Sequence, residues 1–376
     1  MKKMLMVATV PSMIGQFNMS NIQILQEMGY EVHVACDIRD RSVWNEEKIR
    51  NFKENLMNKN IQLYQIDFSR NALKIWNHIR AYKQLLNLVE KEQYNLIHCH
   101  TPIAGALSRL VCHNTSIKCI YTAHGFHFFK GAPLKNWLLF YPMEKWCSKY
   151  TDALVTINTE DYKLAKSKFK AKQVYYIPGV GVDTKEFMLD KYDKISLREE
   201  FNVPPNAKVL LSIGELNKNK NHQLVIKALS EIGNKNIYYI IAGSGGEEHY
   251  LNRLINKLHL QNQIKLLGYY KQVKKLYAIA DAFIFPSYRE GLSVALMEAI
   301  STGLPIACSK IRGNVDLVDD DVGCLFEPNN IEECKNAIIK LEYVNIEQIK
   351  EHNYKKIKSF DIGVINKMMK KVYLDI

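Results

Sequence analysis

Two glutamates in the second half of the chain, Glu290 and Glu298, are separated by seven residues. The apolar run Ala282–Phe285 precedes them and predicts a buried strand, which Pro286 stops. From Ser293 onward, apolar residues recur at the spacing of a helix. The start of a helix offers free backbone N–H groups to a phosphate, and a carboxylate further along can accept two hydrogen bonds from a vicinal diol such as a ribose. The stretch therefore predicts a site that binds a phosphate and a diol together.

The loop between this strand and this helix supplies the N–H groups of Gly291, Leu292 and Ser293. Gly291 lets a ligand approach the backbone closely because it has no side chain. Glu290, at the tip of the loop, would face whatever group hangs from the far side of the phosphate. Two glutamates alone are more often solvated residues of a plain strand–helix unit. The surrounding sequence must therefore decide between a binding site and solvated surface residues.

That wider pattern resembles a known family. Residues 286–306, PSYREGLSVALMEAISTGLPI, are similar to the E-x7-E signature of family 4 glycosyltransferases. In that family the first glutamate contacts the donor sugar and the second binds the nucleotide ribose, which implies these roles for Glu290 and Glu298. The resemblance covers most of the chain, with its motifs in the family's order. It implies an α/β fold of the GT-B type, in which two Rossmann-like domains with doubly wound parallel sheets face a central cleft.

A second motif concerns the donor diphosphate. Residues 214–222, GELNKNKNH, occupy the position of the family's G-R-L-x-x-x-K-G loop, which implies donor contacts for Gly214 and Lys220. Taken alone, a lysine in such a loop is simply solvated. Glu215 replaces the family's arginine, so a cation is missing from its expected place beside the diphosphate. Three other residues could supply it: Lys218, Arg289 and Arg312. Glu215 itself either turns to solvent or binds a hydroxyl or an acceptor group.

Two further segments complete the expected donor site. The glycine turn at Gly243 ends a strand predicted over residues 237–241, and in the family this turn lies near the nucleotide. Residues 309–314, SKIRGN, correspond to the family's S-x-x-G-G segment, which closes the pocket wall opposite Glu298. The resemblance therefore implies donor-binding roles for Gly243 and Arg312.

The first half of the chain alternates apolar, β-branched strands with helices, which predicts a parallel, doubly wound sheet. We expect strands at 4–10, 31–36, 61–66, 95–100, 117–123, 153–157 and 174–177. Ligands of such sheets bind beyond the carboxyl ends of the strands. Three segments are predicted to meet there: 11–15, 100–105 and 124–131.

Two of these segments contain candidate site residues. Residues 11–15 are expected to form a loop near the diphosphate, but this chain has only Gly15 where most family members carry a Gly-Gly pair, so Gly15 is a weak site residue. A lone histidine after a strand, such as His124, is more often structural. In the family, however, the histidine at this position faces the reaction centre and contacts the donor sugar. The resemblance implies that role for His124, with His127 as the second candidate. The expected catalytic residues are therefore His124, Lys220 and Glu290.

Residues 177–183, IPGVGVD, resemble the family's I-P-N-G-V-D segment, which joins the two domains. The glycines and the proline of this segment indicate a boundary on physical grounds as well. We expect an acceptor-side domain at 1–180 and a nucleotide-sugar-binding domain at 181–356. The final helix, in a segment of about 357–376, is expected to pack back on the first domain.

Composition narrows the class of protein. An apolar share of 47% with 24% charged residues is ordinary for a globular protein, and no apolar run approaches the roughly 20 residues of a membrane span. The N-terminus continues as a strand without a cleavage site, which argues against a signal peptide. The net charge of +12 implies an anionic partner, but scattered basic residues without a recognition motif argue against nucleic acid. The absence of G-x-G-x-x-G argues against a nicotinamide dehydrogenase.

The eight cysteines form no C-x-x-C pair and lie mostly in apolar runs, as reduced thiols do in a cytosolic protein. His98, Cys99, His100, Cys112 and His113 resemble a zinc-binding cluster at first sight. On a strand, however, Cys99 points away from His98 and His100. No metal site and no cofactor are therefore expected.

Residues 126–150 contain eight aromatic residues, four lysines and one acid. This mixture suits the interface of an anionic membrane, where rings lie at headgroup depth. The rings could equally be core and inter-helix packing. Family members with the His-Gly-Phe-His pattern resemble exopolysaccharide or capsule assembly enzymes, which extend a lipid-diphosphate-linked sugar at the inner membrane face. We therefore expect a cytoplasmic protein attached peripherally to that face.

The resulting hypothesis is a retaining, metal-independent glycosyltransferase. It moves a sugar from a nucleotide-sugar donor, a UDP-linked hexose or N-acetylhexosamine, to a lipid-linked saccharide acceptor in cell-surface polysaccharide synthesis. One alternative is a sugar-nucleotide 2-epimerase of similar architecture. Another is a non-catalytic nucleotide- or anion-binding protein, which the net charge and Glu215 would suit.

Overall fold

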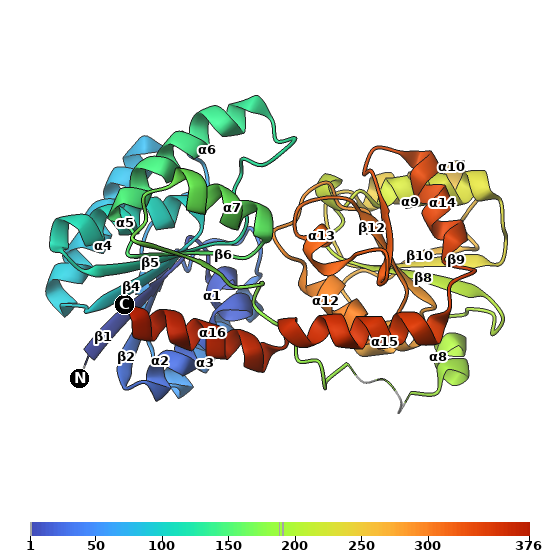
Figure 1. Ribbon diagram of the computed structural model, residues 1–376, viewed down its shortest axis with the longest axis horizontal. Coiled ribbons are helices and arrows are strands. Elements are labelled where there is room, and N and C mark those ends of the chain that lie inside the picture. The colour runs from blue at the N-terminus through green and yellow to red at the C-terminus, as the bar shows by residue number, and fades with distance from the viewer. Residues whose placement is uncertain (1, 188, 190–191) are drawn as a thin grey trace. The chain divides into compact units, whose positions relative to one another are not determined.

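The computed structural model describes residues 2–187, 189 and 192–376, and it divides into two α/β units (Figure 1). The first unit consists of Met1–Val180 together with Ile365–Ile376, and the second consists of Gly181–Val364. The division falls inside the segment 177–183, whose glycines and proline indicate a boundary in the sequence. Two doubly wound units with parallel sheets are the fold class that the sequence predicts.

The first unit is built on a seven-stranded sheet in the order β3-β2-β1-β4-β5-β6-β7, and all of its strand pairs are parallel. The order runs one way from β1 to β3 and the other way from β4 to β7. The switch point of the sheet therefore lies between β1 and β4, where ligands of such folds bind. The strands are β1 (Lys2–Val7), β2 (Tyr30–Cys36), β3 (Gln62–Gln65), β4 (Leu96–His100), β5 (Lys118–Ala123), β6 (Ala153–Thr156) and β7 (Gln173–Tyr176).

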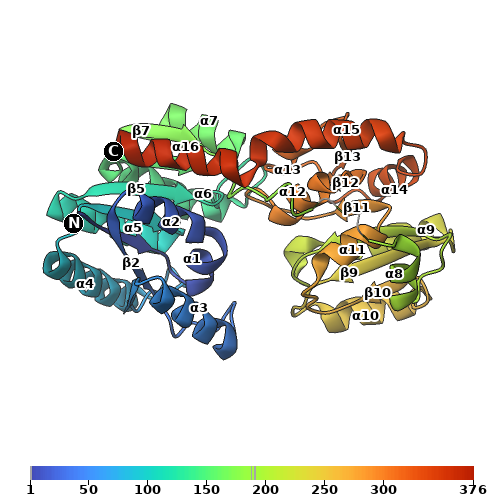
Figure 2. The same cartoon turned by 90° about the horizontal axis from the view of Figure 1, so that it is seen from below.

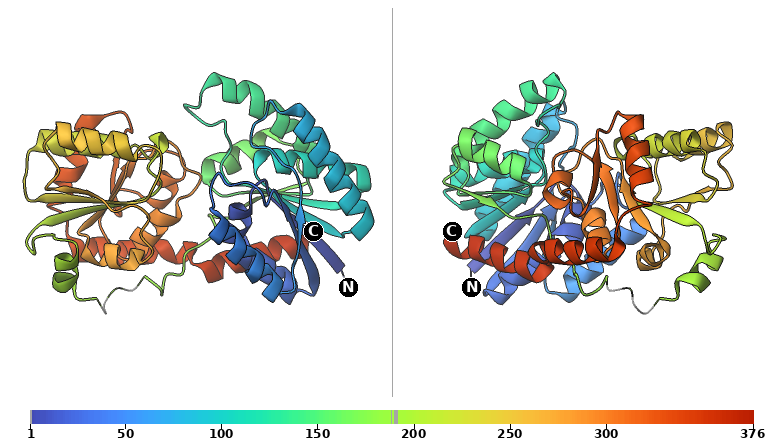
Figure 3. Two further views of the ribbon diagram at one scale, coloured as in Figure 1. Left: turned by 180° about the vertical axis from the view of Figure 1, so that it is seen from behind. Right: turned by 45° about the vertical axis from the view of Figure 1, so that its right-hand side comes forward.

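Helices cover both faces of this sheet, as Figures 1 and 3 show. Along β1, Met4 and Met6 belong to one apolar cluster, whereas Leu5 and Val7 belong to another. All four are fully buried, as the alternation of side chains requires when a strand is covered on both faces. The helices are α1 (Pro11–Phe17), α2 (Met19–Glu27), α3 (Glu46–Asn58), α4 (Ile75–Glu92), α5 (Pro102–Thr115), α6 (Leu134–Cys147), the short η1 (Ser148–Tyr150) and α7 (Thr159–Lys168).

The predicted strands of the first half are all present, with bounds that differ by a few residues, but residues 11–15 are not the loop that the sequence predicts. They form most of α1, which begins at Pro11. Proline suits the first position of a helix because its missing N–H would have no partner there. Gly15 lies inside this helix against Trp44, where a Cβ would be 2.3 Å from the indole ring. The packing of Trp44 against this helix therefore explains why residue 15 is a glycine.

The second unit contains a six-stranded parallel sheet in the order β10-β9-β8-β11-β12-β13. Val209 and Leu211 of β8 face one apolar cluster and Leu210 faces the other, so this sheet is also covered on both faces. The strands are β8 (Lys208–Ile213), β9 (Ile237–Ala242), β10 (Ile264–Leu266), β11 (Ala282–Phe285), β12 (Ile306–Ser309) and β13 (Gly323–Phe326). The helices are α8 (Lys194–Glu200), η2 (Lys218–Lys220), α9 (His222–Ile232), α10 (Glu248–Lys257), α11 (Val273–Ile279), α12 (Val294–Ser301), α13 (Asn314–Leu317), α14 (Ile331–Lys340), α15 (Ile346–Ile357) and η3 (Lys358–Phe360).

The last helix, α16 (Ile362–Asp375), lies on the first unit (Figures 1 and 2). Its residues Ile365, Met369 and Val372 join the apolar cluster of that unit. Tyr373 adds a polar contact, because its hydroxyl lies 2.9 Å from Nδ1 of the fully buried His98.

The segment that returns to the first unit begins later than the sequence predicts. Residues 357–364 belong to the second unit, where Ile357 and Phe360 are part of the apolar core. Val182 holds them there through two backbone hydrogen bonds, from its N–H to Phe360 and from Ile362 to its carbonyl. The apolar spacing in the sequence predicts the helix, but it does not show which of the two cores the first turn of the helix packs against.

We expect Tyr373→Phe to lower the free energy of unfolding of the first unit by about 1–3 kcal/mol, because it leaves a buried ring nitrogen of His98 without a partner. All four tryptophans lie in this unit, so their fluorescence during urea unfolding reports on it alone. Tyr175→Phe is the matched control, since its hydroxyl contacts surface groups and its loss should cost less than about 0.5 kcal/mol. Equal effects of the two variants would contradict the role of Tyr373.

Candidate active site

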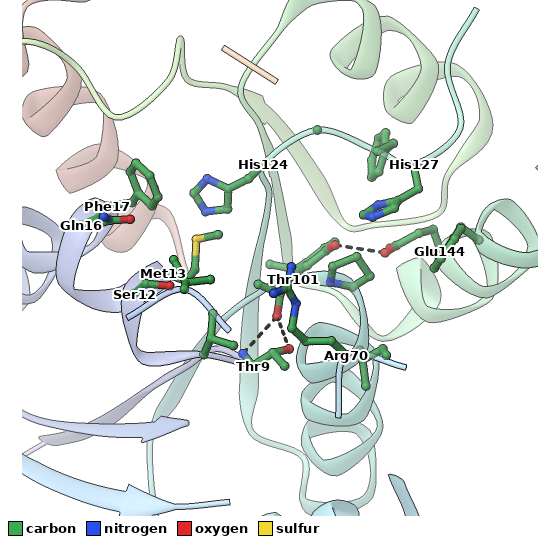
Figure 4. A pocket seen from close by; sticks show the side chains of 18 of the residues that line it. Thr9, Ser12, Met13, Gln16, Phe17, Arg70, Thr101, His124, His127 and Glu144 are labelled. Carbon is green, nitrogen blue, oxygen red and sulfur yellow. Dashed lines mark hydrogen bonds between the residues drawn. The ribbon is translucent and has the colours of Figure 1, made fainter. Parts of the chain in front are cut away.

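The first unit has a pocket of about 460 Å³ beyond the carboxyl ends of β1, β4 and β5 (Figure 4). Each of the three segments predicted to meet at this edge contributes to its lining, with Ser12, Thr101 and His124 among the residues. The convergence that the sequence predicts is therefore confirmed.

Thr101 joins the ends of β1 and β4 at this pocket. Its hydroxyl accepts a hydrogen bond from the Thr9 N–H at 3.1 Å and lies 2.7 Å from the Thr9 hydroxyl. The φ angle of Thr101 is 66° with ψ at 148°, a positive-φ conformation that is rare for a β-branched residue. Such strain persists only where surrounding contacts impose it, and it is often found at functional sites.

A buried ion pair forms part of the pocket wall. Glu144 and Tyr121 line the pocket, and the Tyr121 hydroxyl donates to Glu144 Oε1 at 3.0 Å. The Arg109 guanidinium, itself buried, lies 2.8 Å from Glu144 Oε2 and 4.0 Å from the centre of the Tyr121 ring. A buried carboxylate of this kind is tolerated because it is paired. Glu144, the single acid of residues 126–150, therefore points inward and adds no charge to the surface.

His124 follows β5 directly and faces this pocket, as the sequence predicts (Figure 4). Its Nε2 lies 3.1 Å from Nδ1 of His100. Burial lowers the pKa of His124 to about 4, so the ring is neutral near pH 7 and acts as a hydrogen-bonding group. His127 lines the same pocket, and its ring packs against Phe140 with centroids 4.6 Å apart.

The second unit brings Lys220 and Glu290 together, although 70 residues separate them in the chain. The Lys220 ammonium donates to Glu290 Oε1 at 2.7 Å, and it lies 4.6 Å from the centre of the Phe285 ring. Two hydrogen bonds tie the loops that carry them: Tyr288 N–H to Asn219 O, and the Asn219 side chain to the carbonyl of the residue before Glu290. The carboxyl ends of β8 and β11 are neighbours in the sheet, which explains the contact.

The loop after Glu290 leaves its backbone donors available. α12 begins at Val294 with Ser293 as its N-cap, whose hydroxyl accepts a hydrogen bond from Leu296 N–H at 3.3 Å. Within the described ranges, the N–H groups of residues 291–293 donate no hydrogen bond. Arg312 adds a cation against this loop, with its Nε 3.3 Å from the carbonyl oxygen of Glu290. Free N–H groups beside a lysine and an arginine suit an anion such as a diphosphate.

Glu298 lies further along α12 in a largely buried position. The Tyr277 hydroxyl is 2.9 Å from Glu298 Oε2 and 3.0 Å from the Ala295 carbonyl oxygen. Burial raises the pKa of Glu298 to about 7, against the lowering effect of the hydrogen bond from Tyr277. The carboxyl group therefore changes charge close to neutral pH.

The two glycines of the predicted donor site pack against each other. A Cβ on Gly243 would lie 1.8 Å from the Gly214 carbonyl oxygen, so the ends of β8 and β9 approach more closely than a side chain allows. The Glu215 side chain is exposed and forms no hydrogen bond or ion pair with any described residue, which fits the expectation that it turns to solvent. Direct contacts of Gly214 and Gly243 with a nucleotide stay a prediction.

Some residues of these sites have no motif in the sequence. Tyr277, which contacts Glu298, comes from α11, and His100, which contacts His124, comes from the end of β4. The position of His100 at the end of a strand was the available signal. In the described part of the chain, no three His, Cys, Asp or Glu residues form a group suited to a metal ion.

Comparison with known proteins assigns the family. The model described as "Glycosyltransferase Family 4" matches residues 21–186, and the model described as "Glycosyl transferases group 1" matches residues 193–357. EpsD of Bacillus subtilis, whose own glycosyltransferase assignment is provisional, is 33% identical over 326 residues, which cover 85% of this chain and 81% of EpsD. An Escherichia coli UDP-Gal:alpha-D-GlcNAc-diphosphoundecaprenol alpha-1,3-galactosyltransferase is 27% identical over 79% of each chain.

Solved structures show the same fold at lower identity. HepE from Anabaena, in complex with UDP and glucose, has a TM-score of 0.79 at 19% identity over the whole of both chains. WaaG, a glycosyltransferase of lipopolysaccharide biosynthesis, has a TM-score of 0.71 at 14% identity over 99% of each chain. The chain belongs to the family 4 glycosyltransferases and has the GT-B fold.

We expect Lys220→Ala to lower kcat by about 10²- to 10³-fold and to change KM far less, because negative charge on a leaving diphosphate grows as its bond to the sugar breaks. Steady-state kinetics with the donor identified by screening measures both constants. Lys218→Ala is the comparison, since Lys218 is exposed two residues away and should have little effect. Glu215→Arg should leave activity unchanged or raise it. Full activity of Lys220→Ala would remove this loop from the donor site.

The pKa of Glu298 predicts a pH-dependent affinity for the nucleotide. The ionised carboxylate accepts both ribose hydroxyls, so affinity should fall as the pH drops through about 7 and the group becomes protonated. Between about pH 8 and pH 6 the ionised fraction falls about tenfold, and Kd should rise by that factor. UDP-glucose is a suitable calorimetric probe because both phosphates are esterified. Glu298→Gln should bind more weakly, by about 1–3 kcal/mol, and without this pH dependence; a wild-type Kd independent of pH would contradict the assignment.

Proposed function

We propose that this protein transfers a hexose or N-acetylhexosamine from a UDP-sugar to a lipid-diphosphate-linked saccharide in cell-surface polysaccharide synthesis. The reaction proceeds with retention of configuration and without a metal ion. The observation that carries the proposal is the cluster in the second unit: Lys220 beside Glu290, followed by free N–H groups and by Glu298. The name of the Escherichia coli relative, which gives a UDP-sugar donor and a diphosphoundecaprenol-linked acceptor, supports the choice of substrates.

In this proposal, each part of the cluster binds one part of the donor. The N–H groups of 291–293 and the Lys220 ammonium take the diphosphate, and Arg312 supplies the second cation that Glu215 cannot. Glu298 accepts the ribose hydroxyls, and Glu290 contacts the sugar. The cations and N–H groups stabilise the charge that develops on the leaving diphosphate. A leaving phosphate oxygen can accept the proton of the acceptor hydroxyl, so no protein residue is assigned as nucleophile.

A donor screen tests this function. Purified protein is incubated with UDP-glucose, UDP-galactose, UDP-GlcNAc or UDP-GalNAc, with and without membrane lipid extract, and UDP release is measured in the presence of EDTA. We expect release that depends on the lipid extract with one of these donors. Formation of a 2-epimer from UDP-GlcNAc without an acceptor would establish the epimerase instead. Binding of UDP without turnover of any donor would favour a non-catalytic protein.

We further propose that the first unit attaches to the anionic inner face of the cell membrane. Of residues 126–150, Phe126 and Phe128 are buried and Tyr141 packs against the core, so much of this aromatic set is packing. The exposed apolar residues of α6 are instead mainly leucines, with 72% of Leu134 and 71% of Leu138 accessible. The four lysines beside them are all exposed: Lys130, Lys135, Lys145 and Lys149.

A second exposed apolar surface, which the sequence does not predict, lies at the start of α4. Leu73 and Trp76 are more than four-fifths exposed, and Ile75 and Ile79 are exposed next to them. No acid occurs between Asp67 and Glu90, whereas Arg70, Lys74, Arg80 and Lys83 do. Arg70 and Phe140 of α6 line the same pocket, so the segments that carry the two surfaces both border it. Of the four basic residues, Arg80 is paired with Asp67, and the other three lie in a stretch without an acid. Exposed apolar residues beside such positive charge suit an anionic lipid surface. No helix of the described residues is long and apolar enough to span a membrane.

Replacing Lys130, Lys135, Lys145 and Lys149 by glutamine should release the protein from anionic vesicles, at about 1 kcal/mol per lysine. Cosedimentation with phosphatidylglycerol-containing vesicles at low salt measures the effect. The control replaces four exposed lysines of the second unit: Lys235, Lys257, Lys271 and Lys340. Trp76→Ser should also weaken binding, because α4 contributes. Indifference of the wild type to anionic vesicles would refute the attachment.

A further inference from the structure

His100 stands between a sulfur atom and the predicted catalytic histidine. Its Nε2 lies 3.1 Å from Met6 Sδ, and its Nδ1 lies 3.1 Å from Nε2 of His124. The residue is fully buried. Each ring nitrogen of His100 therefore has one hydrogen-bond partner. The chemistry of these two partners determines which of the two nitrogens carries the proton.

A thioether sulfur can only accept a hydrogen bond. The Nε2 of His100 therefore carries the proton, because a bare nitrogen would place its lone pair against the sulfur of Met6. Burial lowers the pKa of His100 well below its usual value, so the ring holds one proton only. It follows that Nδ1 of His100 is a bare acceptor.

This arrangement decides the tautomer of His124. Facing a bare nitrogen, Nε2 of His124 must donate, and as a neutral ring His124 then has a bare Nδ1. That Nδ1 makes no hydrogen bond with any residue that the structure describes. His124 lines the pocket next to Phe17 (Figure 4), so its remaining nitrogen is available to a ligand there.

We propose that His100 is a positioning residue that holds His124 in the Nε2-protonated tautomer, so that the pocket presents an acceptor nitrogen to a hydroxyl group of the bound sugar. The hydroxyl contact rests on the proposed function, whereas the tautomer does not. A site built to accept a hydrogen bond from a hydroxyl discriminates strongly against a ligand that lacks one. His124 is thus a determinant of which sugar hydroxyl must be free.

His98 is the natural comparison, since it is fully buried on the same strand two residues earlier. Its Nδ1 lies 2.9 Å from the Tyr373 hydroxyl and its Nε2 lies 2.8 Å from the Thr122 hydroxyl. Neither nitrogen bonds to His100 or His124. The His98 ring does pack against the His100 ring, with centroids 4.3 Å apart. A change at His98 therefore removes a neighbouring buried imidazole but neither of the two hydrogen-bond contacts that join Met6, His100 and His124.

The first test reads the tautomer directly. Long-range ¹H–¹⁵N spectra of histidine-labelled wild-type protein are recorded near pH 7, and the His124 signals are assigned with His124→Gln. We expect a protonated Nε2 and a bare, pyridine-like Nδ1 in His124, and a protonated Nε2 in His100. A protonated Nδ1 in His124, or a bare Nε2 in His100, would overturn the proposal whether or not a donor is known.

The second test separates positioning from packing. His100→Leu should lower kcat by about tenfold or more with little change in KM, and should leave His124 as a mixture of tautomers. His100→Asn, whose amide oxygen can accept from Nε2–H, should restore the tautomer and most of the activity. His98→Leu should leave the His124 spectrum unchanged. A wild-type tautomer in His100→Leu would refute the role of His100. Absence of turnover with every donor would refute the proposed function and leave the spectroscopic result standing.

Discussion

Both units of this protein depend on one constraint: a parallel sheet that helices cover on both faces excludes water along its strands, so a polar side chain there needs a hydrogen-bond partner, as His98 has. The strand interiors are apolar and buried, as the fully buried residues of β1 and β11 illustrate. Polar side chains collect where the strands end. Thr101 and His124 follow β4 and β5, and Glu290 follows β11. The sites therefore consist of loops that the regular part of each sheet holds in position.

Desolvation then determines which of these groups carry charge. His98 and His124 have no acidic partner, so burial lowers their pKa values to about 3 and about 4, and they remain neutral. Arg109 and Glu144 form a buried ion pair, in which each charge compensates the other. Among the residues that the structure describes, Glu298 has only a tyrosine hydroxyl as hydrogen-bond partner, and its pKa of about 7 reflects that poorer compensation. The same physical effect thus yields neutral histidines in one unit and a titratable carboxyl group in the other.

Much of the fold could be predicted because its signal is local. Apolar runs of strand length alternating with helical spacing identify the parallel sheets, and a proline with two glycines identifies the boundary near residue 180. The errors also have local causes. Residues 11–15 were expected as a loop because the family carries a glycine loop after this strand, yet Pro11 starts a helix and Gly15 makes room for Trp44. The aromatic residues 126–150 contain no sign of which rings pack inward.

The sequence by itself determined the family, the order of the elements and the charged residues of the loop that precedes α12. Residue types and short spacings encode these features. Only the tertiary structure decided that Lys220 meets Glu290, that Tyr277 meets Glu298, and that His100 meets both Met6 and His124. These contacts join residues from different strand ends, and their partners are selected by the order of strands in the sheet. Strand order results from the packing of the whole unit, which no local spacing records.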